Sequence, residues 1–160
     1  MNPLCQALAD RLDQGADALA VFASTLSEAE WATRVPKDGR TVGVMVHHVA
    51  SVYPIEIQLA QALAAGNPIV GVTWEGIHQM NADHASKNGS VTKKETLELL
   101  RTNSTAASRA VRALSDSELT QGGTISLYAD APLTCQFMLE DHAVRHSYHH
   151  LAKIKAALAR

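Results

Sequence analysis

Residues 41–65, TVGVMVHHVASVYPIEIQLAQALAA, form the stretch that decides the fold. Apolar side chains recur in it at spacings of three and four residues, which places them along one side of an amphipathic helix. These side chains are Val42, Met45, Val49, Val52, Ile55 and Leu59. Thr41 is a suitable N-cap and Gly66 follows the last apolar turn, so a helix is predicted over residues 41–65, with a kink at Pro54.

The same periodicity predicts three further long helices and one short one. The long helices are expected over residues 4–25, 92–114 and 133–159, and the short helix over residues 75–87. Ser27 to Glu30 and Thr92 to Glu95 have the pattern of capping boxes, which open helices.

Residues 115–132 are rich in turn formers and include Gly122-Gly123. A short apolar alternation from Thr124 to Tyr128 has no second strand of comparable quality to pair with. We therefore interpret this stretch as a loop.

Four long helices without a sheet predict an all-α fold, a four-helix bundle. The connection between the second and third helices has about 25 residues, which is long enough to cross the bundle. A chain of 160 residues, 46% of them hydrophobic, fits one domain over residues 1–160.

Composition excludes several classes of partner. The formal net charge is −2, and the 14 basic and 16 acidic residues are scattered, so neither nucleic acid nor a membrane surface is an expected partner. No stretch approaches the roughly 20 apolar residues that span a bilayer, and the N-terminal segment is interrupted by charges. The two cysteines, Cys5 and Cys135, are isolated in sequence and are expected to be buried and inert. A reducing, cytoplasmic location fits this usage best.

The histidines are clustered. The chain has eight, and six of them fall in two windows, one on the second long helix and one on the fourth: His47, His48, His142, His146, His149 and His150. On an α-helix the four in the last window lie along one face. Histidines four residues apart can bind one ion, and both His142 with His146 and His146 with His150 have that spacing.

A further ligand must come from elsewhere, and the second helix can supply it. Neighbouring residues on a helix point about 100° apart, so only one of His47 and His48 can face the fourth helix. We favour His48, which lies nearer the apolar stripe. Three histidines would leave coordination positions open for water or substrate, as in catalytic sites. The alternative is that these histidines are surface residues or hydrogen-bonded core residues.

These segments resemble the DinB-like family. The motifs that carry the resemblance are Val44 to Ala50, Ile77 to Ala82 followed by Val91 to Glu95, and Arg145 to Ile154. The resemblance implies an up-up-down-down bundle that often dimerises, with a metal on His48, His146 and His150. Lys153 departs from the family pattern, which commonly has glutamine there.

The resemblance also implies a function. It indicates a divalent metal such as zinc or nickel and, in some members, a thiol-dependent transferase, isomerase or hydrolase activity on a small molecule, with a low-molecular-weight thiol as co-substrate. Apolar residues such as Leu4, Phe22 and Leu158 add to the expectation of a homodimer.

The sequence assigns no catalytic side chain. Glu56, Glu140 and Asp141 are candidates for a general base, and His142 and His149 for hydrogen-bond partners of the ligands. Two functions therefore stay open: a metal-dependent enzyme, and a non-catalytic or stress-related bundle whose metal ion holds two helices together.

Overall fold

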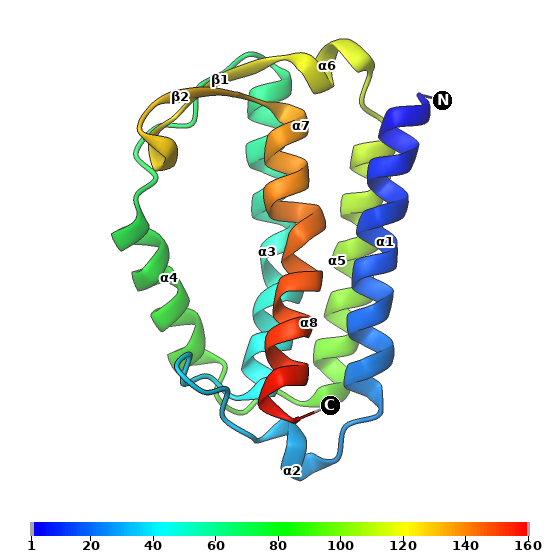
Figure 1. Cartoon of the computed structure of the whole chain (residues 1–160), viewed down its shortest axis with the longest axis vertical. Coiled ribbons are helices and arrows are strands. Elements are labelled where there is room, and N and C mark those ends of the chain that lie inside the picture. Colours follow the sequence, from blue (N-terminus) through cyan, green and yellow to red (C-terminus); the bar gives the residue numbers. More distant parts are fainter. Residues whose placement is uncertain (1, 160) are drawn as a thin grey trace.

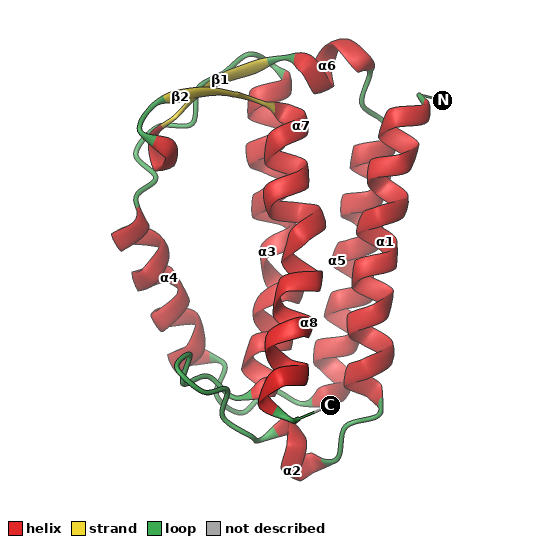
Figure 2. Cartoon of the chain, in the orientation of Figure 1, coloured by secondary structure: helices red, strands yellow, loops and turns green. Residues whose placement is uncertain are grey.

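A computed structural model describes residues 2–159, and four long helices dominate it (Figures 1 and 2). Three of them are α1 (Pro3–Ser24), α3 (Val42–Ala64) and α5 (Lys93–Arg112). The fourth begins as α7 (Cys135–Met138), continues through a π-helical segment (Leu139–Val144) and ends as α8 (Arg145–Ala157). The predicted all-α four-helix bundle is confirmed, and α3 continues through Pro54.

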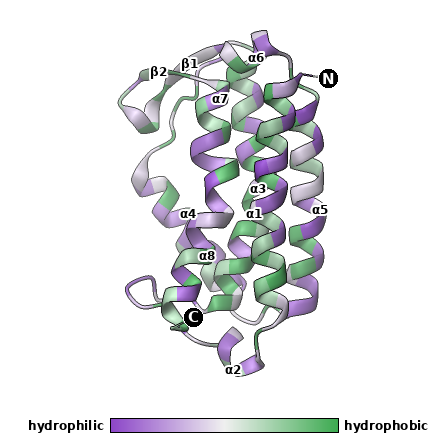
Figure 3. Cartoon of the chain, turned by 45° about the vertical axis from the view of Figure 1, so that its right-hand side comes forward, coloured by the Kyte–Doolittle hydropathy of each residue, from purple (hydrophilic) through white to green (hydrophobic). Residues whose placement is uncertain are grey.

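The core lies where α1, α3, α5 and the C-terminal helix face one another, and Figure 3 shows hydrophobic residues gathered on these inner sides. Leu8, Leu12 and Leu19 of α1 and Tyr53 of α3 all belong to this core, each of them at most 1% exposed. Burial of each such side chain contributes about 1.5 to 3 kcal/mol to folding. No helix within residues 2–159 is both long and apolar enough to cross a membrane.

The order of helix directions is up-down-down-up, so the expected up-up-down-down order is wrong. Cys5 near the start of α1 bonds to the carbonyl of Leu114 just beyond α5, which makes α1 and α5 antiparallel. Trp31 lies against Gly43 at the start of α3 and bonds to the carbonyl of Val91 just before α5, so α3 and α5 start at the same end.

Connection lengths explain these directions. The short link after α1, which contains α2 (Glu28–Trp31), turns the chain straight back into α3. The longer connection after α3 returns along the bundle, so that α5 starts where α3 started. The capping box predicted at Ser27 is present at the start of α2.

The short helix predicted over residues 75–87 is α4 (Trp74–Lys87), which leans away from the bundle in Figure 1. None of its residues is fully buried. Its contact with α3 includes a hydrogen bond of 2.9 Å between His47 Nδ1 and His84 Nε2. The helix therefore forms an outer wall beside α3 instead of a fifth member of the core.

The loop interpretation of residues 115–132 needs correction. After the one-turn helix α6 (Asp116–Thr120), strands β1 (Gly122–Ile125) and β2 (Ala131–Thr134) form an antiparallel hairpin. Ile69, in the connection after α3, bridges to Ile125 and extends the pairing. Gly123 has no Cβ, and this allows it to approach the backbone of Asn67.

The C-terminal helix departs from the prediction of one continuous helix over residues 133–159. Thr134 caps it, so it starts at Cys135, two residues later than expected. The π-helical turn at Leu139–Val144 then widens the helix immediately before His146. Such turns are rare and often lie next to functional sites.

Candidate metal centre

Three histidines meet between α3 and α8. His48, His146 and His150 each offer a ring nitrogen, and these three nitrogens lie within 4.8 Å of one another. Nε2 of His48 and Nε2 of His146 are 3.2 Å apart. Nitrogens bound to one ion at about 2 Å lie about 3 to 4 Å apart, so only small side-chain adjustments would be needed to hold an ion.

Burial keeps two of these histidines neutral. His48 and His150 are 5% and 6% exposed. Desolvation, assisted by the neighbouring His146, lowers the pKa of His48 to about 3 and also lowers the pKa of His150. Metal ligation requires neutral imidazole, so neither ring has to lose a proton to bind an ion at neutral pH. Nδ1 of His150 is buried without a hydrogen-bond partner.

Glu56 supports the third histidine. It lies two turns beyond His48 on α3, is 6% exposed, and its Oε1 contacts Nδ1 of His146 in a short hydrogen bond. A carboxylate that accepts the second N–H of a ligand histidine fixes the ring's tautomer and orientation. Its other oxygen, Oε2, is buried without a partner. The sequence showed Glu56 only as one acidic residue among three, although its position inside an apolar helix face was a signal.

His47 points away from the three histidines. It is half-buried and bonds to His84 of α4, whose Nε2 also lies 3.3 Å from Ser51 Oγ. His48, and not His47, therefore lies in the group of three, and its role as a ligand stays a prediction. Sequence reasoning missed His84, because the two histidines of α4, His78 and His84, do not have the three- or four-residue spacing of a ligand pair.

The other two histidines of α8 and its π-helical turn also lie outside the group. His142 Nε2 is 3.0 Å from the hydroxyl of Tyr128, which donates to Asp141 at 2.7 Å. Burial and Asp141 raise the pKa of Tyr128 to about 12. His149 is exposed and lies edge-on to His150. Neither His142 nor His149 is hydrogen-bonded to a ring of the three, so the expected supporting role is not seen for either.

The three histidines open onto a cavity of about 860 Å³ between α4 and the bundle. Apolar side chains of α4 line its outer wall, among them Trp74, Ile77 and Met80. Trp74 and Met80 are 55% and 42% exposed. A partly apolar cavity with a few convergent polar groups is typical of small-molecule sites.

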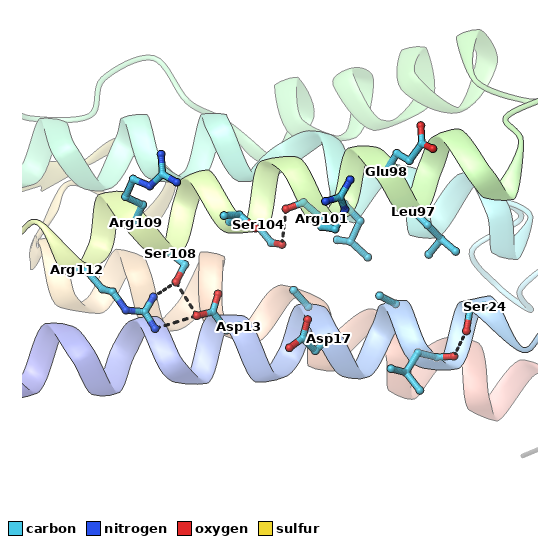
Figure 4. A pocket seen from close by; sticks show the side chains of 15 residues that line it. Asp13, Asp17, Ser24, Leu97, Glu98, Arg101, Ser104, Ser108, Arg109 and Arg112 are labelled. Atoms are coloured by element: carbon cyan, nitrogen blue, oxygen red, sulfur yellow. Dashed lines mark hydrogen bonds and ion pairs between the residues drawn. The ribbon is translucent and has the colours of Figure 1, made fainter.

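A second hollow of about 850 Å³ lies between α1 and α5, and Figure 4 shows it from close by. Its lining contains no histidine or cysteine. The figure shows Arg112 turned toward Asp13 and Ser108, to which it is hydrogen-bonded. These charges stabilise the packing of two helices and do not form a metal-ligand set.

Both cysteines are buried and free, as predicted. Burial raises the pKa of Cys135 to about 11 and also raises that of Cys5. A thiol is nucleophilic as the thiolate, so neither is activated at neutral pH.

The sequence model of the DinB superfamily matches residues 11–154 of this chain. The chain belongs to the DinB superfamily. A search of curated proteins found no match.

Two solved structures share the fold of this DinB-superfamily chain. One is YfiT from Bacillus subtilis, described as a probable metal-dependent hydrolase with an unusual four-helix bundle topology; the TM-score is 0.77 at 18% identity, over 100% of this chain and 89% of that one. The other is a mycothiol-dependent maleylpyruvate isomerase, with a TM-score of 0.72 at 12% identity, over 94% of this chain and 60% of that one. At these identities the likeness establishes the fold alone.

Proposed function

We propose that this protein is a metal-dependent enzyme that binds a divalent ion through His48, His146 and His150 and acts on a small molecule. The observation that carries the proposal is the meeting of three imidazoles, two of them held neutral by burial, on the wall of an 860 Å³ cavity. Zinc or nickel fits this ligand set, since both accept imidazole.

The chemistry we propose is transfer or hydrolysis at a small electrophile, with a low-molecular-weight thiol as a candidate co-substrate. A divalent ion with an open position lowers the pKa of a bound water or thiol and presents it as an anion. Glu56 orients His146, and the apolar wall of α4 limits the access of water. The alternative, a metal that only joins α3 to α8, would not require a cavity beside the ligands.

Metal content decides the first half of the proposal. Protein purified without a histidine tag is expected to hold about one ion per chain by mass spectrometry. Replacing His150 by alanine is expected to remove most metal affinity, and His48→Ala should behave similarly, because two histidines hold an ion weakly. His149→Ala is the matched control, since its exposed ring lies outside the group. Chelator competition measures all three, and His149 as the most damaging substitution would show that the ligand set is wrong.

An activity measurement tests the second half of the proposal, that the protein is an enzyme. Metal-loaded and chelator-treated protein would be screened with small electrophiles in the presence and absence of a thiol. Conjugation or hydrolysis that depends on the metal supports the enzyme. Full metal occupancy with rates equal to the chelated sample would favour the alternative of a metal that joins two helices.

A further inference from the structure

The cavity beside the three histidines has an uneven distribution of charge. At one end Arg145 pairs with Asp141 at 3.1 Å, and near the middle Glu56 pairs with His146. At the other end Arg40 and Lys153 share a single carboxylate, Asp38. Two cations against one anion leave this end of the cavity with an excess positive charge.

Arg40 is held firmly and is only partly satisfied. Its Nε and Nη2 donate to the two oxygens of Asp38 at 2.6 and 2.9 Å, a bidentate pair whose side chains are 13% exposed. The remaining nitrogen, Nη1, is buried without a hydrogen-bond partner. A buried donor without an acceptor costs about 1 to 3 kcal/mol, and a charged one costs more, so this atom is suited to an acceptor supplied from outside.

The charged end belongs to the same cavity as the candidate metal ligands. Arg40 and Lys153 line the same cavity as His48 and His150. The charge of Arg40 also contributes to lowering the pKa of both histidines. In the opposite direction the cavity continues past the histidines to apolar side chains such as Trp74 and Ile77.

We infer that the substrate of the proposed reaction is an amphipathic carboxylate, whose anionic group binds at Arg40 and Lys153 while its apolar body extends past the histidines along α4. A guanidinium nitrogen and an ammonium group match carboxylate oxygens by charge and by hydrogen bonding. The apolar wall gives the rest of the molecule a place to exclude water. This inference rests on the proposed function, because it names the substrate class of the same site.

Hexanoate and its neutral analogue hexanamide are suitable probes, since they differ only in the charged group. Calorimetric titration is expected to show hexanoate binding about tenfold more tightly than hexanamide, the size expected for a charge-assisted hydrogen bond. Arg40→Gln should abolish the preference, and Lys153→Gln should reduce it by a smaller factor. Arg101→Gln, on the exposed side of α5, is the matched control and should keep it. Lys153→Gln leaves the Asp38–Arg40 pair intact, so it tests the charge even if Arg40→Gln fails to fold.

Titrations of zinc-loaded and chelator-treated protein, with metal content measured on the same samples, separate the two proposals. A preference that depends on Arg40 in both states supports the carboxylate site. Equal affinity for the two probes, or a preference that survives Arg40→Gln and vanishes with the metal, would overturn it. If the protein takes up no metal but keeps the Arg40-dependent preference for hexanoate, the result contradicts the metal proposal alone.

Discussion

Glu56 converts a group of three histidines into an ordered site. Its contact with Nδ1 of His146 leaves Nε2 of that ring facing His48. Replacing Glu56 by glutamine keeps the size of the side chain but removes the charge that fixes the tautomer. Metal affinity is expected to fall by about 10- to 100-fold, the usual effect of losing such a partner.

Chelator competition on Glu56→Gln measures this effect, and Glu98→Gln on the exposed face of α5 is the matched control. Unchanged affinity in both variants would mean that His146 needs no carboxylate to bind an ion.

The low pKa of His48 makes the stability of the metal-free protein depend on pH. The unfolded chain has an ordinary histidine pKa of about 6.5, whereas the folded pKa is about 3. As the pH falls below 6.5, His48 becomes protonated in the unfolded chain but stays neutral in the folded chain. The free energy of unfolding therefore decreases until the pH reaches about 3. Between pH 7 and pH 5 this decrease should amount to about 2 kcal/mol from His48 alone.

Urea unfolding of chelator-treated protein at the two pH values tests this dependence. His48→Gln should lose about 2 kcal/mol less than the natural chain over the same interval. Parallel pH dependence in the two proteins would show that His48 titrates normally in the fold.

At this scale the sequence indicated which three histidines lie together but not their neighbours, and their role as metal ligands stays a prediction. The spacing of His146 and His150 and the position of His48 were visible, because helix geometry relates spacing directly to direction. The partners of Glu56 and His84 were not visible, because those contacts depend on how separate helices are placed against one another.

Among the elements, the long helices were predicted within one or two residues at most ends, because each carries an apolar stripe and a cap. The β1–β2 hairpin was missed for a physical reason. Each strand has four residues, and Ile69 from a distant segment completes the pairing. A local pattern cannot reveal a strand whose pairing is partly non-local. The π-helical turn has no sequence signature of its own and was also missed.

The hairpin depends on Gly123. A Cβ at this position would lie 2.8 Å from the carbonyl oxygen of Asn67, and backbone atoms cannot easily move away. Gly123→Ala is therefore expected to destabilise the fold by about 1 to 3 kcal/mol.

Gly89→Ala is the matched control, since a Cβ there would meet nothing closer than 3.9 Å. Thermal or urea unfolding compares the two variants. Equal stability of the two variants would mean that the backbone of Asn67 can move away from an added Cβ at little cost.

For the whole molecule, the expected homodimer stays a prediction. The structure changes which apolar residues are available for the contact between the two copies. Phe22 and Leu158 are partly buried against the core, so they are less available than expected. Leu4 and Val21 on α1 are 39% and 66% exposed, and we expect them to contribute apolar surface to the contact with a second copy. Single-domain organisation and the cytoplasmic location likewise stay predictions.

Light scattering at micromolar concentration tests the dimer. We expect twice the chain mass, and Val21→Gln should shift the equilibrium toward the monomer. A mass of 17.2 kDa for the natural chain across this concentration range would contradict the prediction.

The large separation in sequence between the three histidines has a consequence for folding. His48 and His146 are 98 residues apart in sequence, so the ligand set is complete only after the last helix has docked on the bundle. Contacts of such long range are costly in chain entropy and form late. An ion bound at this site would therefore leave the folding rate nearly unchanged and slow unfolding, which would give the metal-loaded protein kinetic stability.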